Sequence, residues 1–225
     1  MLLLENIKNH IRVSIIIILA LLIILTLLII LALLIILALL TTCFNMDYRK
    51  KAIKVVLIGD GGVGKTSFVH QHRIGEFVDK YNATMGMEVH PLKFHTNHGP
   101  IIFNGWDCAG QEKLGGMKEG YYSQAQCSIV MFDHQSLLTL KNVDKWQEDV
   151  LRVAGDKPMV LVGNKNDLGQ KYKPNNSQKE GCLAYHSISA KTNYGYEMPF
   201  LTLAKHFLGE DTVFFTEPQT SDDIL

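Results

Sequence analysis

The sequence lacks an excess of charge of either sign, and it has few cysteines. Its 225 residues hold 22 Lys plus Arg and 22 Asp plus Glu, so the formal net charge is zero. Domains that coat nucleic acid usually carry a clear basic excess, so we expect no direct, sequence-specific nucleic-acid contact. The four cysteines form no C-x-x-C pair, which argues against a zinc ribbon or a thioredoxin-type redox site and indicates free thiols in a reducing compartment.

Charged residues are also missing from residues 13–46, a run that contains repeats of ALLIIL at residues 20–25 and 32–37. An uncharged apolar run of more than roughly 18 residues is a candidate transmembrane helix. Basic residues flank it on both sides, so its orientation is not predicted, and no signal-peptide cleavage site stands out. A six-residue repeat matches no helical face, and a DNA repeat translated from a wrong upstream start would also produce it. Residues 1–45 are therefore either a membrane anchor or a dispensable extension before Met46.

A glycine-rich segment follows the first strand-like run of conventional composition. Residues 53–58 (IKVVLI) are typical of a buried parallel strand and lead into residues 59–67 (GDGGVGKTS). This order matches the phosphate-loop pattern G-x-x-x-x-G-K-[ST] between a strand and a helix. Glycines allow a tight turn that points backbone N–H groups at an anion, and the helix adds its positive end. Lys65 would reach the β- and γ-phosphates, and the Thr66 hydroxyl would bind Mg²⁺.

Two later segments indicate which base is bound. A predicted buried strand at residues 159–163 is followed by Asn164, Lys165, Asn166 and Asp167. A shorter strand-like stretch is followed by Ser189, Ala190 and Lys191. A carboxylate in the first segment can accept hydrogen bonds from N1–H and the 2-amino group of guanine, whereas adenine would leave a buried Asp unpaired at a cost of about 1–3 kcal/mol. A backbone N–H of the second segment can meet the guanine O6, so the two segments predict a guanine site at the carboxyl ends of the strands.

Two further segments supply candidates for metal binding and hydrolysis. Residues 101–106 alternate like a strand and lead into Asp107, which is suited to hold Mg²⁺ through a water. After it, the Gly110 N–H could touch the γ-phosphate and Gln111 could orient the attacking water. Thr84, which precedes the next strand, could complete the Mg²⁺ shell when GTP is bound. Segments held by the γ-phosphate and released on hydrolysis would make a binary switch.

These elements predict one doubly wound α/β domain. We expect a six-stranded, mostly parallel sheet with a P-loop and five helices, and an antiparallel hairpin of residues 87–95 and 101–106 at one edge. Residues 136–153 read as a single amphipathic helix that packs on the sheet. Strand alternation places His90 and His95 on opposite faces, so we interpret His90, His95 and His98 as a solvated or partner-facing set.

The residues resemble the Ras superfamily of small GTPases, and within it most closely the Ran family of nuclear-transport GTPases. The phosphate-loop and guanine motifs point only to a small GTPase. Two longer segments point to the Ran family: residues 89–101 (VHPLKFHTNHGPI) and 120–127 (GYYSQAQC). The resemblance extends over about residues 51–218. We therefore expect a GTPase domain at residues 46–218 and a short acidic tail at residues 219–225.

The resemblance implies slow GTP hydrolysis and a role for each matching residue. The implied catalytic residues are Lys65, Tyr81 and Gln111, of which Tyr81 and Gln111 would work with an activating protein that supplies no arginine finger. The implied ligands of Mg²⁺ are Thr66, Thr84 and Asp107. The implied contacts of GTP or GDP are Asp60, Gly61, Gly62, Val63, Gly64, Lys65, Thr66, Ser67, Val78, Asp79, Lys80, Tyr81, Asn82, Ala83, Thr84, Gly110, Asn164, Lys165, Asn166, Asp167, Ser189, Ala190 and Lys191.

The resemblance also implies partners. It implies a monomer in the nucleus and cytoplasm that meets importin- and exportin-type transport receptors, an exchange factor, a GTPase-activating protein and a nuclear import carrier. Glu112 and Lys113 match positions that contact the exchange factor and the carrier. No cysteine follows Cys182, so a C-terminal prenyl anchor is not expected, as in the Ran family.

The sequence departs from the Ran pattern at three places. Cys108 replaces the usual threonine, and residues 169–178 are shorter and less basic than the family's lysine-rich receptor-docking segment. The chain lacks room after Pro218 for the family's C-terminal helix, so we expect weaker coupling between nucleotide state and Ran-binding domains. Two alternatives stay open: a membrane-tethered small GTPase of vesicle traffic, if residues 13–46 are an anchor, and a GTP-binding regulatory module without physiological hydrolysis.

Overall fold

The computed structural model describes residues 19, 21–36, 52–74, 86–108, 117–209 and 213–216. The chain divides into two compact units, residues 1–46 and 47–225. In the first unit, residues 21–36 are helical and their leucine and isoleucine side chains are exposed. Within the described ranges, no helix is both long enough and apolar enough to cross a membrane. Much of the apolar run at residues 13–46 lies outside these ranges.

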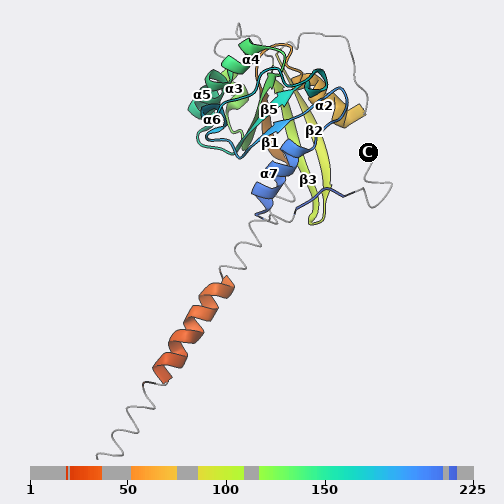
Figure 1. Cartoon of the computed structure of the whole chain (residues 1–225). Helices are drawn as coiled ribbons and strands as arrows, with labels where there is room; N and C mark the ends of the chain where they lie inside the picture. Colours follow the sequence, from red (N-terminus) through yellow and green to blue (C-terminus); the bar gives the residue numbers. More distant parts are fainter. Residues whose placement is uncertain are drawn as a thin grey trace, which may run out of the picture. The chain divides into compact units, whose positions relative to one another are not determined.

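The second unit contains a mixed six-stranded sheet (Figure 1). Its strands are β1 (Ile53–Ile58), β2 (Met87–Thr96), β3 (Gly99–Cys108), β4 (Cys127–Asp133), β5 (Met159–Asn164) and β6 (Ala184–Ser187). They lie in the order β2-β3-β1-β4-β5-β6, and every neighbouring pair is parallel except β2 with β3. The predicted fold class and the antiparallel edge hairpin are confirmed. This topology brings the carboxyl ends of β1, β3, β4, β5 and β6 to one edge.

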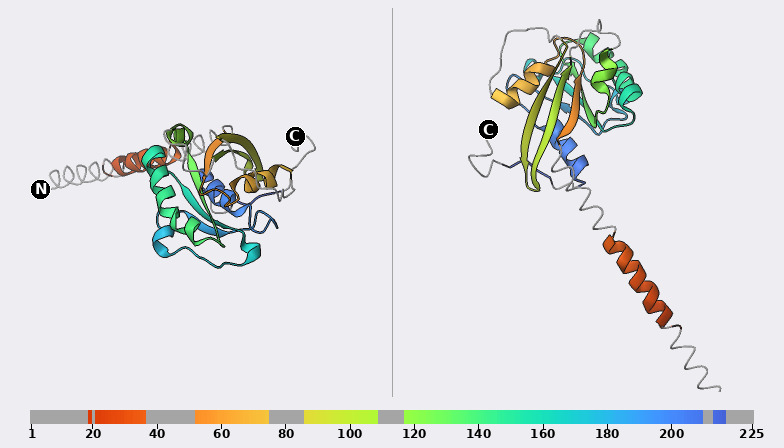
Figure 2. Two further views of the ribbon diagram at one scale, coloured as in Figure 1. Left: turned by 90° about the horizontal axis from the view of Figure 1, so that it is seen from above. Right: turned by 180° about the vertical axis from the view of Figure 1, so that it is seen from behind.

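Helices cover both faces of the sheet, and the two views of Figure 2 show α2 and α5 on opposite sides. The helices of this unit are α2 (Lys65–Ile74), α3 (Met117–Tyr122), α4 (Leu137–Lys141), α5 (Val143–Ala154), α6 (Asn176–Lys179) and α7 (Met198–Leu208). On one face Val55 belongs to a cluster with Phe68 of α2 and Phe200 of α7, whose rings stack at 5.2 Å. On the other face Val56 clusters with Trp146 of α5. β1 is therefore buried on both sides, as its apolar run predicts.

The prediction of a single helix at residues 136–153 is wrong, because the chain breaks at Asn142 between α4 and α5. The backbone N–H of Asn142 still donates to the carbonyls of Leu138 and Leu140 and closes α4. Its side-chain Nδ2 donates to the Asp60 carboxylate at 2.8 Å. This break, together with the one-turn helix α6, gives more than the five helices predicted. A hydrogen bond to a residue far away in the sequence fixes the position of the break, which helix periodicity cannot reveal.

The described cysteines are free thiols, as predicted, and Cys43 lies outside the described residues. Cys108 is buried, and burial raises the pKa of its thiol to about 12. Burial also raises the pKa of the Cys127 thiol. Both thiols are therefore protonated at neutral pH and are poor nucleophiles.

Candidate functional site

The phosphate loop runs from the end of β1 into the first turn of α2. The Lys65 side chain folds back over this loop, and its Nζ donates to the carbonyl oxygens of Gly59 at 2.8 Å and Asp60 at 2.9 Å. The backbone N–H of Phe68 donates to the Gly64 carbonyl at 2.9 Å and starts the helix. A loop that closes on its own lysine at a helix N-terminus is suited to bind an anionic phosphate.

Two glycines of the loop leave no room for a side chain. A Cβ on Gly59 would lie 2.2 Å from the Met131 carbonyl oxygen, and one on Gly64 would lie 2.3 Å from Nδ2 of Asn164. Both glycines also have positive φ angles, 142° and 98°. Any larger residue would push the loop away from β4 or from Asn164 at the end of β5. The pattern glycines are thus required by packing as well as by backbone conformation.

Burial gives Lys65 an unusual charge balance. Desolvation lowers the pKa of its ammonium group to about 8, and the nearby carboxylates of Asp107 and Asp60 oppose this shift. The side chain is only 6% exposed. A buried cation with a lowered pKa gains stability from a nearby anion, so a bound phosphate would raise the pKa of Lys65.

Thr66 and Asp107 bring two oxygen ligands together next to the phosphate loop. Thr66 Oγ1 donates to Asp107 Oδ2 at 2.5 Å. Asp107 is completely buried at the end of β3, and its Oδ1 has no hydrogen-bond partner among the described residues. Burial raises the pKa of this carboxyl group, and the Thr66 hydrogen bond and the Lys65 charge oppose the shift. An unpartnered buried carboxylate oxygen beside a hydroxyl fits the oxygen coordination that Mg²⁺ requires.

Asp60 links the phosphate loop to α5, a contact that the sequence motifs do not indicate. Its carboxylate accepts from Trp146 Nε1 and from Asn142 Nδ2, both at 2.8 Å. Trp146 is otherwise a buried core residue of the helix. In the sequence, this contact is indicated only by the indole N–H of Trp146, a polar group on an otherwise apolar helix face. The loop is therefore anchored on both sides, by β1 and by α5.

We expect Trp146→Phe to lower the free energy of unfolding by about 1.5–3 kcal/mol, since it removes a hydrogen bond to a charged acceptor but keeps most of the packing. Urea denaturation of the nucleotide-free protein measures this loss. The control is Tyr194→Phe, which also removes one polar group from an aromatic side chain but at an exposed position. A Trp146→Phe variant as stable as the Tyr194→Phe variant would show that Asp60 does not depend on the indole.

Asn164 joins the phosphate loop to the segments that follow β5 and β6. Its Nδ2 donates to the Val63 carbonyl at 2.9 Å, and its Oδ1 accepts from the Ala190 N–H at 3.0 Å. A backbone N–H of the segment Ser189-Ala190-Lys191 was expected to meet guanine O6, and Asn164 accepts from one of these groups, the Ala190 N–H. Lys165 adopts a left-handed φ of 64°, and its Nζ lies 2.7 Å from Asp133 Oδ2. These contacts hold three loops at one edge of the sheet.

Asp167 differs from the expected buried carboxylate because its side chain is exposed. Its Oδ1 accepts from Ser189 Oγ at 2.6 Å, and Ser189 Oγ also accepts from the Thr192 N–H at 3.1 Å. The two base-reading segments are therefore joined directly. An exposed carboxylate that lacks a hydrogen-bond partner costs little free energy, because water can solvate it. Asp167 would therefore discriminate against adenine only if the bound base covers its carboxylate.

Some of the remaining predicted site residues lie within the described ranges, and the others lie outside them. Gly61 and Gly62 form the exposed turn of the loop, and Val63 is buried beneath it. Ser67 lies in the first turn of α2, Asn166 begins a short 3₁₀ turn at Asn166–Leu168, and Lys191 lies in the turn after Ala190. The following predicted residues lie outside the described ranges: Val78, Asp79, Lys80, Tyr81, Asn82, Ala83, Thr84, Gly110, Gln111, Glu112 and Lys113.

His134, which the sequence reading missed, is completely buried beside the base-reading segments. Its Nδ1 lies 2.8 Å from the Tyr172 carbonyl oxygen, and its Nε2 lies 2.9 Å from Ser187 Oγ. The carbonyl requires a proton on Nδ1, so the neutral ring can accept from Ser187 at Nε2. Burial lowers the pKa of His134, and the hydrogen bond to Tyr172 opposes the shift. The ring is therefore neutral in the folded protein at neutral pH.

We expect the protein to lose stability as the pH falls below about 6.5, because the folded-state pKa of His134 lies below the unfolded value. The stabilising contribution is fully present above the unfolded pKa and disappears as the pH falls through the folded pKa. The free energy of unfolding, measured between pH 7.5 and pH 5, should change less steeply with pH in His134→Asn than in the parent, by up to about 1.4 kcal/mol per pH unit. An identical slope in His134→Asn and in the exposed control His206→Asn would contradict this assignment.

Comparison with known protein families matches most of this chain. A model described as the Ras family matches residues 54–209, from the first strand of the sheet to the end of the last helix. The matched region contains the phosphate loop, the Thr66–Asp107 pair and both base-reading segments.

Proposed function

The chain belongs to the Ras family of small GTPases, whose members bind GTP or GDP with Mg²⁺ and act as switches, and we propose that it is a Ran-type switch of nucleocytoplasmic transport. The observation that carries this proposal is the Ran-like sequence of residues 89–101 and 120–127. The first of these segments forms most of β2, the turn and the first residues of β3, and β2 is an edge of the sheet where a partner can bind. The nucleotide would control which partners bind.

The geometry supports a role for each placed residue. Lys65 would hold the β- and γ-phosphates as a buried point charge, and Thr66 with Asp107 would supply oxygen ligands to Mg²⁺. Asn164 would keep the base segments against the phosphate loop through its contacts with Val63 and Ala190. Asp167 would accept from the guanine edge. The bound Mg²⁺ would neutralise phosphate charge, while the protein orients both groups.

Hydrolysis would depend on residues of the two switch segments. We assign Gln111 to orient the attacking water, Thr84 to complete the Mg²⁺ shell and Tyr81 to act with Gln111 when a GTPase-activating protein is bound. Gly110 would donate to the γ-phosphate. Single-turnover GTP hydrolysis with a Ran-type activating protein tests this mechanism, because Gln111→Leu should abolish the stimulation and leave nucleotide binding intact. Stimulation that survives in Gln111→Leu would contradict the role assigned to Gln111. A parent protein whose hydrolysis the activating protein does not stimulate would support the alternative of a binding module without physiological hydrolysis.

The family implies an exchange factor and a GTPase-activating protein. We further propose importin- and exportin-type receptors and a nuclear import carrier as partners, with Glu112 and Lys113 in the contacts. The active protein would be a monomer of residues 46–218 with the tail 219–225, in the nucleus and cytoplasm.

Receptor binding tests the Ran-type role separately from GTP binding. We expect the full chain loaded with a non-hydrolysable GTP analogue to bind an importin-type receptor roughly 10–100-fold more tightly than the GDP form. A small GTPase of vesicle traffic loaded in the same way is the control. Equal binding of the two nucleotide forms, or no binding, would remove the Ran-type role and leave the family membership unaffected.

Exposed leucine and isoleucine side chains on residues 21–36 favour a second candidate function, a membrane-tethered GTPase of vesicle traffic. Under this alternative the native protein would fractionate with membranes, and removal of residues 1–45 would release it. N-terminal sequencing of the native protein distinguishes the alternatives, since a start at Met46 would exclude the anchor.

A further inference from the structure

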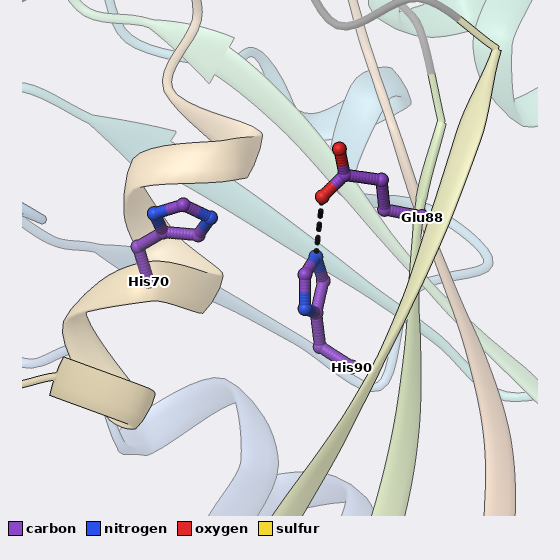
Figure 3. A group of neighbouring side chains, drawn as sticks. All are labelled: His70, Glu88 and His90. Carbon is purple, nitrogen blue, oxygen red and sulfur yellow. Dashed lines mark ion pairs between the residues drawn. The ribbon is translucent and has the colours of Figure 1, made fainter.

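Three potential metal ligands come together between α2 and β2 (Figure 3). His70 projects from α2, and Glu88 and His90 project from β2 toward it. Their ligand atoms all lie within 4.8 Å of one another. His90 Nε2 lies 3.2 Å from Glu88 Oε2, and the two imidazole rings are 5.7 Å apart. None of these three residues belongs to the phosphate or base site.

The fold explains why these side chains meet. Glu88 and His90 are two residues apart on a strand, so they share one face of the hairpin. The same face continues through Leu92 to a core that includes Phe68 of α2. His70 lies on α2, and its imidazole ring meets the ring of His90 edge-on. The expectation that His90 belongs to a solvated or partner-facing set is wrong, because His90 is only 5% exposed.

The spacing fits a small tetrahedral ion. Two ligand atoms bound to one zinc at about 2.0–2.1 Å lie roughly 3.3 Å apart. The separation of 3.2 Å between His90 and Glu88 already meets this requirement. His70 is half-buried on a helix surface, so rotation of its side chain can bring it into range. His90 and Glu88 therefore already have the spacing of two zinc ligands, and His70 would rotate to become the third.

The donor types and their exposure favour a transition metal over Mg²⁺. Mg²⁺ prefers oxygen ligands, whereas two imidazoles and one carboxylate suit Zn²⁺ and similar ions. The Glu88 side chain is 58% exposed, so an ion can enter from solvent and a water can fill a fourth position. Buried His90 supplies the rigid side of the site. Asp107 pairs with Glu88 in the β2–β3 register and adds negative charge nearby.

We propose that His70, Glu88 and His90 form a binding site for a divalent transition-metal ion, namely Zn²⁺. This site is distinct from the Mg²⁺ site beside the nucleotide. The ion would link the middle of α2 to the start of β2. It would therefore restrain the two elements that enclose residues 75–85 in the chain. Zinc occupancy would also raise the stability of the folded state, since the three ligands come together only there.

The test uses the full chain loaded with GDP in excess Mg²⁺, titrated with Zn²⁺ in a calorimeter. We expect one ion per chain, bound at least roughly tenfold more weakly by His70→Gln and by Glu88→Gln, because each variant removes a ligand. His95→Gln, on the opposite face of β2, is the matched control and should bind as the parent does. His70 and Glu88 are not buried, so the variants should retain GDP and fold normally, which circular dichroism checks.

A second measurement locates the ion independently of affinity. Zn²⁺ should shift the imidazole NMR signals of two histidines, one of which disappears in His70→Gln. Unchanged Zn²⁺ affinity in His70→Gln would mean that zinc binds elsewhere, for example in place of Mg²⁺, and would overturn the proposal. Shifts confined to other histidines, or no binding in excess Mg²⁺, would also overturn it.

Discussion

Lys65→Met is expected to weaken the binding of GTP by roughly 100-fold or more and the binding of GDP by roughly 10–100-fold. The ammonium group would make charge-assisted hydrogen bonds to the β- and γ-phosphates of GTP but only to the β-phosphate of GDP, and each bond contributes about 1.5–3 kcal/mol. Methionine has a similar length and no charge, so it fills the buried space next to Gly59 without making these bonds. Displacement of a fluorescent GDP analogue measures the affinity.

The same variant makes a prediction about stability that separates binding from misfolding. Burial lowers the pKa of Lys65 to about 8, so the charged side chain is disfavoured in the folded protein without nucleotide. Lys65→Met removes this desolvation cost and also the two hydrogen bonds from Nζ to the carbonyls of Gly59 and Asp60. The two effects oppose each other, so the variant should unfold at a urea concentration close to that of the parent in the absence of nucleotide. Lys157→Met, an exposed change outside the site, is the control for affinity. Parent-like nucleotide affinity in Lys65→Met would mean that this lysine does not contact the phosphates.

Asp167→Asn is expected to reverse the base preference from GTP to xanthosine triphosphate. Asp167 can accept from both N1–H and the 2-amino group of guanine, and an amide cannot accept both hydrogen bonds. Xanthine has a carbonyl oxygen in place of the 2-amino group, so the Asn amide can donate to it and accept from N1–H. We expect GTP affinity to fall roughly 100-fold or more while xanthosine triphosphate affinity rises.

The reversal has a close control in Asp156→Asn, another exposed aspartate, which lies before β5 and outside the site. Asp167 also accepts from Ser189 Oγ, a bond that the Asn carbonyl oxygen can retain. The variant should therefore keep the two base segments joined. Equal losses for both nucleotides would indicate a distorted loop, and an unchanged preference for GTP would remove Asp167 from base recognition.

Local sequence patterns were sufficient to predict the sheet and the residues at its carboxyl edge. The apolar runs at residues 53–58 and 159–163 specify buried parallel strands, and a glycine-rich turn at the end of the first specifies the anion site. The hairpin was equally predictable, because alternating residues flank a turn that contains Asn97 and Gly99. These features depend on residues close together in the chain.

Contacts between distant residues explain what could not be predicted. Asp60 holds Asn142 and Trp146, more than 80 positions away, and this pairing places the break between α4 and α5. His134 is neutral and buried because Tyr172 and Ser187 surround it, and neither residue is near it in the sequence. No single-sequence pattern encodes such partners.

Nucleotide competition on the purified chain tests the guanine-nucleotide pocket most directly. A fluorescent GDP analogue bound in the presence of Mg²⁺ would be displaced by GTP, GDP or ATP. We expect displacement by GTP and GDP at similar concentrations and by ATP only at a concentration roughly 10⁴-fold higher. Equal displacement by ATP and GTP, or no binding of the analogue by a folded chain, would contradict it.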